Sequence, residues 1–452
     1  MIGPFTNVDL GDGRSIDLYL LRIDKEGELL SRQTQQALLG AVPDKSDVFV
    51  FCHGWNNTFD QAKDSYLEFI KGYAAQRQRL GRPIPANYKP LLIGIIWPST
   101  SFVLPWEQGP AIAGGPPPAE HEKEELLSLI GEVASPKTFG QLTELVDGVD
   151  ALGPAEALEA AEVMRGVLTA SAAPEDPTSV LSAADLVHAW QTLQSGAPAP
   201  AAPDDFGGAV LPWQAGQAPG PQAAGSISLD PRGLLRLASV WLMKDRAGRV
   251  GARGVAPLLE AILNGSNTRL HLIGHSFGAR VMLSALTVQG SPRKAHSLLL
   301  LQPAVNRWCF ADDVVGRHTP GGYRPVLDRV ERPILTTYSR HDLPLHEVFH
   351  LAVRDNSLGE PQIAAVGDTY RYGALGGYGP EGLGTRLGSV SAQREGTPYP
   401  LPGGVPIVQV DGGVDGIKVD GVDTHPDDPA IADHGDVNTT ITWWALHTLT
   451  EA

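Results

Sequence analysis

A serine between glycines stands at the centre of the segment Gly274-His275-Ser276-Phe277-Gly278. The apolar run RLHLI (269–273) precedes it and the helical pattern ARVMLSALTV follows it, so the serine falls at a sharp strand-to-helix turn. Flanking glycines remove the clashes that would prevent such a turn, which exposes the hydroxyl at the end of the strand. This context predicts that Ser276 is the nucleophile of an acyl-transfer site, although a serine in an ordinary glycine turn is the alternative.

A second segment has the composition of an oxyanion loop. The apolar run DVFVFC (47–52) continues into HGWNNT (53–58). Acyl transfer needs two backbone N–H donors for the developing oxyanion, one from the residue after the nucleophile and one from a loop after an earlier strand. We expect these donors to be Phe277 and Trp55, with Asn56 and Asn57 holding the loop through side-chain-to-backbone bonds. Four residues are expected to support the site: His53, Gly54, Asn56 and His275.

A serine nucleophile needs a base and an orienting acid, which follow it along the chain in this kind of site. Asp342 comes directly after the apolar run PILTTYS (333–339), so we predict that it is the acid; Asp312 and Asp313 are the alternatives. The predicted base is His434, on a loop before the terminal helical pattern, with His425 as the second candidate. The other downstream histidines lie too close to Asp342 or within that helix: His346, His350 and His447.

The elements that must position these residues alternate between strand-length apolar runs and helical patterns, which predicts an α/β fold with a mostly parallel sheet flanked by helices. The predicted strands are 16–23, 47–52, 91–97, 269–273, 297–302, 333–339 and 405–410. Thr58 and Gln61 form a plausible capping box for a helix after the second strand. The apolar stripes expected to be buried are Ala62, Tyr66, Phe69, Ile70 and Tyr73, and Val255, Leu258, Leu259, Ile262 and Leu263.

Two segments interrupt this alternation. Residues 101–232 contain four short helical patterns and end in an Ala/Pro/Gly-rich stretch that is typical of a linker. We predict that they form a cap or lid on a core made of residues 1–100 and 233–452, since long insertions in compact domains are usually functional or disordered. Surface padding is the alternative. The glycine-rich segment 355–404 is expected to be irregular loop.

The motifs together resemble an alpha/beta hydrolase. They are most similar to a bacterial hydrolase family of uncharacterised function that has an H-G-[FYW]-N-N-[ST] turn, a W-P-S strand end and an H-S-x-G elbow, here HGWNNT, Trp97-Pro98-Ser99 and GHSFG. The resemblance covers residues 16–100 and 233–452 and implies a Ser276/Asp342/His434 triad with an oxyanion hole from Trp55 and Phe277. The insertion follows the W-P-S strand, and the stretch from acid to histidine is unusually long, which leaves His425 open as the base.

Composition narrows the classes of function. The chain has 452 residues and a net charge of 35 − 51 = −16, which argues against binding nucleic acid or anionic membrane surfaces. Its two cysteines cannot form a disulfide framework, and Cys52 is expected to be a buried thiol. No signal peptide or apolar stretch of about 20 residues is visible, so we expect a soluble, by default cytoplasmic protein without integral membrane association; signal-independent secretion and any oligomeric state stay open.

The expected function is that of a serine esterase that needs no metal or organic cofactor. A lipase or phospholipase would be favoured if Trp106, Trp190 and Trp213 line an acyl groove, and a catalytically idle binding module is a further alternative. The segment His346-Glu347-Val348-Phe349-His350 fits H-E-x-x-H, so a zinc hydrolase is a third hypothesis. The aspartates between 411 and 436 could hold calcium, although a solvated acidic loop is the simpler interpretation.

Overall fold

A computed structural model of the protein describes residues 3–11, 13–99, 126–146, 149, 151–171, 182–196, 228–314, 318–349, 373–417, 419, 422 and 428–450. The chain divides into two compact units. Unit 1 consists of 1–110, 171–179 and 240–452, and unit 2 of 111–170 and 180–239. The predicted Ala/Pro/Gly-rich linker lies outside the described residues, as do Trp106, Trp213, His350 and His425.

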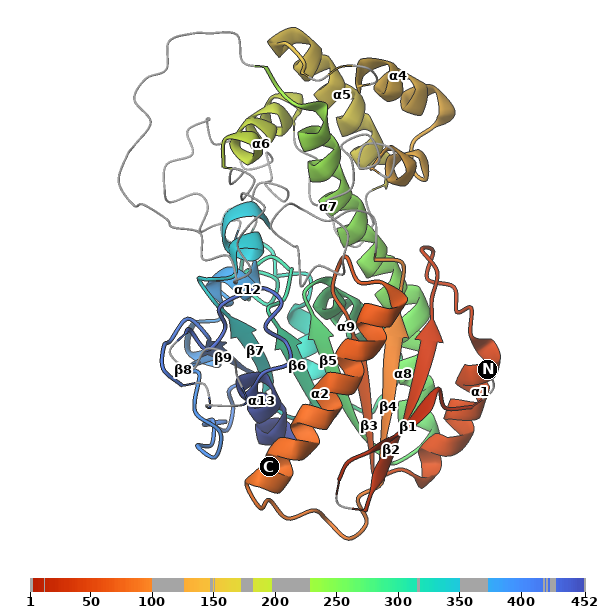
Figure 1. The fold of residues 1–452 in the computed structure, drawn as a ribbon, viewed down its shortest axis with the longest axis vertical. Coiled ribbons are helices and arrows are strands. Elements are labelled where there is room, and N and C mark those ends of the chain that lie inside the picture. Colours follow the sequence, from red (N-terminus) through yellow and green to blue (C-terminus); the bar gives the residue numbers. More distant parts are fainter. Residues whose placement is uncertain are drawn as a thin grey trace, which may run out of the picture. The chain divides into compact units, whose positions relative to one another are not determined.

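Unit 1 is built on a sheet of nine described strands in the order β1-β2-β4-β3-β5-β6-β7-β9-β8 (Figure 1). Only the β1–β2 pair is antiparallel. The strands are β1 (Thr6–Asp9), β2 (Ser15–Arg22), β3 (Asp47–Cys52), β4 (Pro90–Ile96), β5 (Arg269–His275), β6 (Ser297–Leu301), β7 (Ile334–Tyr338), β8 (Leu387–Ser391) and β9 (Ile407–Asp411). Since β4 and β5 pair with opposite sides of β3, the strand order reverses between β3 and β5.

The central strands are apolar on both faces because helices cover both sides of the sheet. Every residue of β3 and β4 is buried, and all seven predicted strands are present to within two residues at each end. The expectation of irregular loop over 355–404 was wrong for its described part: α12 (Leu375–Tyr378) and β8 lie there. The sequence LGSVS of β8 has no apolar run because this edge strand is half-exposed.

Helices α2 (Phe59–Arg79) and α13 (Thr440–Thr450) pack together on one face of the sheet, and α8 (Ala256–Gly265) and α9 (Phe277–Val288) lie behind it (Figure 1). Helix α1 (Arg32–Ala41) contacts α8. The predicted capping box is confirmed, because the Thr58 side chain accepts from the Gln61 N–H and the Gln61 side chain accepts from the Thr58 N–H. The two predicted apolar stripes, on α2 and around α8, are buried as expected.

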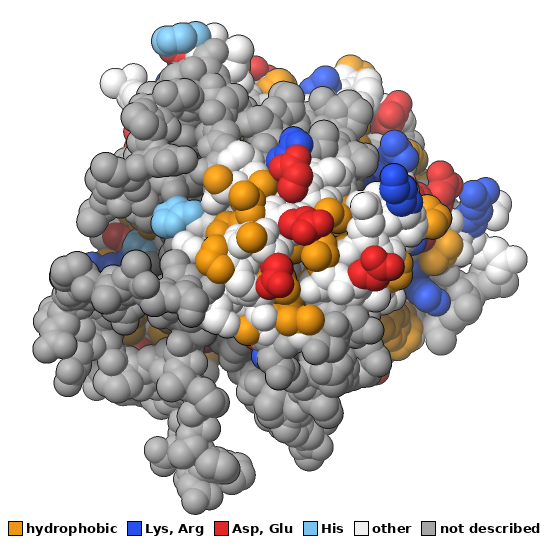
Figure 2. All heavy atoms as spheres, turned by 90° about the horizontal axis from the view of Figure 1, so that it is seen from above, with side chains coloured by type: hydrophobic (Ala, Val, Ile, Leu, Met, Phe, Trp, Pro, Cys, Tyr) orange, Lys and Arg blue, Asp and Glu red, His pale blue; other side chains and the backbone are white. Residues whose placement is uncertain are grey.

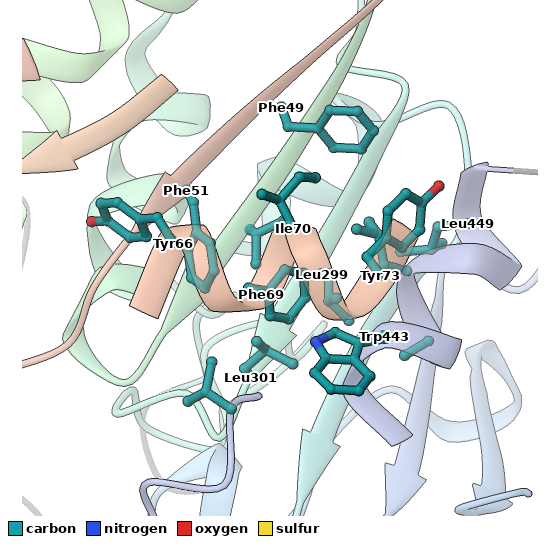
Figure 3. Close-up of a cluster of buried hydrophobic side chains, with 14 of the residues drawn as sticks. Phe49, Phe51, Tyr66, Phe69, Ile70, Tyr73, Leu299, Leu301, Trp443 and Leu449 are labelled. Carbon is teal, nitrogen blue, oxygen red and sulfur yellow. The ribbon is translucent and has the colours of Figure 1, made fainter. Parts of the chain in front are cut away.

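The core on the α2–α13 face consists of interlocking aromatic and aliphatic side chains (Figure 3). Phe51 of β3 meets Phe69 of α2 edge-on with ring centroids 5.1 Å apart and lies 4.9 Å from the Tyr66 ring. Trp443 and Leu449 of α13 join the same cluster. Burial of such large side chains is worth about 1.5–3 kcal/mol each, so this core holds α13, and with it the loop that precedes α13, firmly on the sheet.

Unit 2 is helical in its described part and contains α4 (Pro136–Val146), α5 (Pro154–Ser171), α6 (Ala183–Gly196) and the first part of α7 (Pro231–Arg249). Trp190 is fully buried, and its indole N–H donates to the Asp230 carbonyl at 2.6 Å. It therefore belongs to the core of this unit and does not line an open groove. In the face seen in Figure 2, hydrophobic side chains are interspersed with acidic ones. Across the described residues, no helix combines the length and the apolarity that a membrane crossing would require.

Candidate active site

Ser276 lies between the end of β5 and the start of α9, in a backbone conformation with φ 54° and ψ −124°. Residues other than glycine rarely adopt positive φ, and the strain is on the order of 1–3 kcal/mol. Neighbouring backbone leaves no room for a side chain at Gly278, where a Cβ would lie 2.1 Å from the Cys52 carbonyl oxygen. The predicted strand-to-helix turn is therefore present, and it places the serine at the carboxyl end of β5.

A continuous chain of hydrogen bonds joins Ser276, His434 and Asp342. The His434 Nε2 lies 2.8 Å from the Ser276 Oγ, and its Nδ1 lies 2.7 Å from the Asp342 Oδ2. A carboxylate only accepts, so the imidazole proton belongs on Nδ1 and Nε2 accepts from the serine hydroxyl. The structure thus brings together all three residues that the sequence predicted as nucleophile, base and acid.

Asp342 is fully buried and held from several sides. Its Oδ1 accepts from the Leu345 N–H at 3.0 Å, and its own N–H donates to the Ser339 carbonyl at 3.2 Å. Burial raises the pKa of Asp342, and the hydrogen bonds from His434 and Leu345 oppose that rise. The Asp342 carboxyl group is therefore held in one position, in surroundings where its ionised form is unfavourable. A carboxyl group held in this way can orient an imidazole that becomes positively charged.

The HGW turn after β3 passes directly beside the serine. A Cβ at Gly54 would lie 2.7 Å from the Ser276 Cβ, so only glycine allows this approach. The rings of Trp55 and Phe277 lie 6.3 Å apart, and within the described chain neither of their backbone N–H groups donates a hydrogen bond. Two backbone donors are thus available at the two predicted positions, one directly after Ser276 and one directly after Gly54.

Contacts with the end of β4 fix the HGW turn. Buried Ser99 receives the Asn56 N–H on its carbonyl at 2.9 Å, and its hydroxyl donates to the Asn57 carbonyl at 3.0 Å. The Asn57 side chain donates to the Trp55 carbonyl at 2.9 Å as expected. The same expectation for Asn56 was wrong: within the described residues its side chain makes no hydrogen bond, and it contributes a left-handed conformation with φ 58°. His53 is buried and donates from Nδ1 to the Gly54 carbonyl at 2.8 Å; burial lowers its pKa to about 4 and keeps it neutral.

Three side chains at the ends of consecutive strands hold the loop that carries His434. His275, the last residue of β5, donates to the His434 carbonyl at 2.9 Å. Gln302 after β6 donates to the Asp436 carbonyl at 3.2 Å, and Ser339 after β7 donates to the Ile431 carbonyl at 2.7 Å. Burial lowers the pKa of His275 to about 3, so it stays a neutral donor. We call His275, Gln302 and Ser339 the strand-end donors.

The sequence did not predict Gln302 or Ser339 as site residues. Gln302 is fully buried and strained at φ 39°, and its side-chain oxygen accepts from the Thr337 hydroxyl at 3.0 Å. The available signal was a polar residue that closes an otherwise apolar strand at the carboxyl edge of the sheet. That signal alone does not reveal which distant segment the side chain would contact.

The described alternatives lie apart from the serine. Asp312 is ion-paired with Arg324 and Arg386. His447 lies inside the core and faces the Tyr73 carbonyl at 3.0 Å. The ring of His346 stacks on Tyr378. Asp313 is exposed and pairs with an exposed histidine, His318. Among the residues that the structure describes, no three His, Cys, Asp or Glu side chains converge as a metal site.

No family model, no curated protein and no solved structure matches this chain. Its function must therefore be inferred from the geometry of the site. That geometry combines a strained serine, a histidine able to accept its proton, a buried acid hydrogen-bonded to the histidine, and two backbone donors at the residues that follow Ser276 and Gly54. Such an arrangement suits nucleophilic attack on a carbonyl carbon.

Proposed function

We propose that the protein is a serine hydrolase of the alpha/beta hydrolase type that cleaves carboxylic esters through an acyl-enzyme. The observation that carries the proposal is the hydrogen-bonded chain from Asp342 through His434 to Ser276. Its position, at the carboxyl ends of strands where the strand order reverses, is the usual place for a site in a parallel sheet.

In the first half of the reaction, the Ser276 oxygen attacks the ester carbonyl carbon while its proton passes to His434 Nε2. The N–H groups of Trp55 and Phe277 then hold the oxyanion of the tetrahedral intermediate. Collapse of this intermediate breaks the bond to the alkoxy group, which leaves as an alcohol with the proton from His434. Asp342 holds the imidazole in the required tautomer and stabilises its transient positive charge.

In the second half, a water molecule gives its proton to His434 Nε2 and attacks the acyl carbon. A second tetrahedral intermediate forms, and its collapse returns the proton to Ser276 and releases the carboxylic acid. Each oxyanion donor in such a site contributes about 3–4 kcal/mol to the barrier reduction. The strand-end donors serve both halves because the His434 loop must keep one geometry while its imidazole alternates between base and acid.

Labelling with a fluorophosphonate probe tests the proposal, since such probes react with activated serines. We expect wild type to be labelled, Ser276→Ala to show no labelling and His434→Ala to lose most of it. Ser391→Ala and His318→Ala are matched controls, because both side chains are exposed outside the site. Absence of labelling in folded wild type would contradict the proposal and favour a binding module.

Hydrolysis of p-nitrophenyl esters of rising acyl length then separates an esterase from a lipase. We expect turnover of short esters in free solution. The buried position of Trp190 removes one of the three tryptophans on which an acyl groove was predicted. Activity that appears only with long chains and a lipid interface would replace the esterase assignment by the lipase one.

A further inference from the structure

The hydroxyl of Tyr66 belongs to a core helix, α2, yet it forms two hydrogen bonds to backbone at the edge of the active site. It accepts from the His53 N–H at 2.9 Å and donates to the Ile95 carbonyl at 2.6 Å. The ladder between β3 and β4 ends at the pair of Cys52 and Ile95, so His53 is the first residue beyond it. The hydroxyl therefore bridges the two strands at the point where the HGW turn leaves the sheet.

The structure makes room for this side chain. A Cβ at Gly94, in β4, would lie 2.5 Å from Cδ2 of the Tyr66 ring, so a larger residue there would displace the ring. Tyr66 is fully buried, and its ring centroid lies 4.9 Å from that of Phe51. Burial raises the pKa of Tyr66 well above its ordinary value, so the hydroxyl stays protonated and can donate and accept at the same time.

Ser99 holds the other end of the same turn. It lies just beyond β4 and is buried. Its carbonyl accepts from the Asn56 N–H at 2.9 Å, and its hydroxyl accepts from the Asn57 N–H at 3.2 Å and donates to the Asn57 carbonyl at 3.0 Å. The Tyr66 hydroxyl thus holds the first residue of the segment 53–57, and Ser99 holds its last two.

These contacts decide which N–H groups of the turn are still available. Among the five N–H groups of residues 53–57, three donate to the two hydroxyls and to the Ser99 carbonyl. In the described part of the chain, the other two, those of Gly54 and Trp55, have no acceptor. These two residues lie where the turn passes the serine, since a Cβ at Gly54 would be 2.7 Å from the Ser276 Cβ. Oxyanion stabilisation requires donors that are held in place before the reaction begins.

We propose that the buried hydroxyls of Tyr66 and Ser99 are positioning groups for the oxyanion donor of the HGW turn. Neither hydroxyl needs to contact the substrate, because both act by fixing the backbone on the two sides of the Trp55 N–H. The proposal rests on the proposed hydrolase function and adds two residues outside the triad to it. Groups that position an oxyanion donor stabilise the tetrahedral intermediate more than they stabilise bound substrate, so their loss should lower kcat and leave KM nearly unchanged.

Hydrolysis of p-nitrophenyl acetate by Tyr66→Phe, with Tyr73→Phe as the matched control, tests the proposal. Both variants remove one buried hydroxyl from α2, and the Tyr73 hydroxyl lies 3.0 Å from the Thr450 hydroxyl, so both lose a hydrogen bond. In Figure 3, Tyr66 and Tyr73 lie at opposite ends of the labelled cluster.

We expect Tyr66→Phe to lower kcat about tenfold, with KM within about twofold of wild type. Complete loss of an oxyanion donor lowers kcat about 10²–10³-fold, and in this variant the donor is loosened but still present. Tyr73→Phe should leave both constants within about twofold of wild type, because its hydroxyl does not contact the HGW turn.

Inhibition by a trifluoromethyl ketone gives a second measurement. Such a ketone adds to an active serine and forms a tetrahedral adduct, whose oxyanion needs the same donors as the intermediate of the reaction. Its inhibition constant should rise about tenfold in Tyr66→Phe and stay within about twofold of wild type in Tyr73→Phe. Urea unfolding of each variant shows that it is folded under the conditions of the assay, so a loss of stability alone would not change this constant.

Ser99→Ala tests the other end of the turn, and it decides the question if Tyr66→Phe fails to fold. Its matched control is Ser291→Ala. Ser291 is also buried, and its hydroxyl also accepts from a backbone N–H, that of Arg293, beyond the far end of α9. We expect the same pattern, with a loss in kcat and a rise in the inhibition constant for Ser99→Ala alone.

The outcomes separate this proposal from the hydrolase function. An active wild type whose kcat and inhibition constant are unchanged in Tyr66→Phe and Ser99→Ala would overturn the positioning role alone. Losses of equal size in the control variants would also overturn it, because they would indicate a general effect of removing a buried hydroxyl. A folded wild type that neither hydrolyses esters nor reacts with a fluorophosphonate would refute the hydrolase function, and the positioning role with it.

Discussion

The polar side chains at the two ends of β5 are held in different ways. At the carboxyl end, Ser276, His434 and Asp342 are joined by hydrogen bonds of 2.7–2.8 Å, and the strand-end donors hold the loop behind them. At the amino end, arginines lie over aromatic rings at about 5 Å around an open volume. Short hydrogen bonds hold the atoms of the triad in place to within tenths of an ångström. Stacking on a ring holds a guanidinium group in place but does not fix the direction of its N–H donors.

The difference indicates what each end is suited to do. Bond making needs a reacting atom in one place, so the carboxyl end is rigid and buried. The amino end is concave and is lined by Arg77, Arg82, Arg269 and Arg332. If the carboxyl end of β5 depends on this geometry, variants there should lower activity, and the largest loss is expected at Asp342.

Asp342→Asn should lower kcat by about 10⁴-fold with the fold intact, since an amide favours the wrong imidazole tautomer. Burial already raises the pKa of Asp342, so a neutral amide should leave the free energy of unfolding unchanged or increase it. Ester kinetics and urea unfolding of the same preparation measure both quantities. A parallel loss of activity and stability would mean that Asp342 acts through structure alone.

Acidification should destabilise the protein through the buried histidines at the carboxyl end. Below pH 6.5 the unfolded chain protonates His53, while the folded protein resists until pH falls to about 4, so the free energy of unfolding falls across that window. At about 1.4 kcal/mol per pKa unit, His53 alone contributes roughly 3 kcal/mol of this loss. Urea unfolding of His53→Gln between pH 7.5 and 4.5 should give a flatter dependence than wild type, and identical slopes would refute this prediction.

Gln302→Met should lower kcat about tenfold, with little change in KM, because the side chain keeps its volume but no longer anchors the His434 loop. The pH dependence of kcat should shift, since a looser loop changes the contact between His434 and Asp342. Gln409→Met, on β9 next to the edge strand β8, is the control for a generic loss of a polar side chain. A change confined to stability would show that Gln302 does not position the base.

The smallest effect is expected where a variant at one end of β5 is tested for a change at the other end. Arg332→Gln should leave the rate of fluorophosphonate labelling within about twofold of wild type, because changes at distant sites are usually independent. Labelling rates of the variant and of wild type test this. A large difference would show that the two ends are coupled through β5.

Most of the central sheet and the candidate triad could be predicted from sequence because each depends on local patterns. Apolar runs of five to eight residues indicated the buried strands, and the glycines beside Ser276 indicated the turn that exposes it. The half-exposed strand β8 could not be predicted because it has no apolar run. Its hydrogen bonds with β9 are what make it a strand.

Contacts between distant segments could not be predicted either. Gln302 reaches a carbonyl 134 residues further along the chain, and no spacing rule connects the two. The cavity lined by Arg77, Arg82, Arg269 and Arg332 collects its walls from five segments that are far apart in the sequence. Whether polar residues at strand ends meet one another depends on the order of strands in the sheet, which a single sequence does not give.

The distances along the chain that the triad spans have a consequence for refolding. His434 meets a serine 158 residues away and an acid 92 residues away, so the three groups come together only after β5, β7 and the segment before α13 have all docked. Contacts of such long range form late, because loop closure must precede them. Covalent capture of Ser276 during refolding from urea would therefore time the completion of the native sheet, with far-ultraviolet circular dichroism recovering earlier than reactivity.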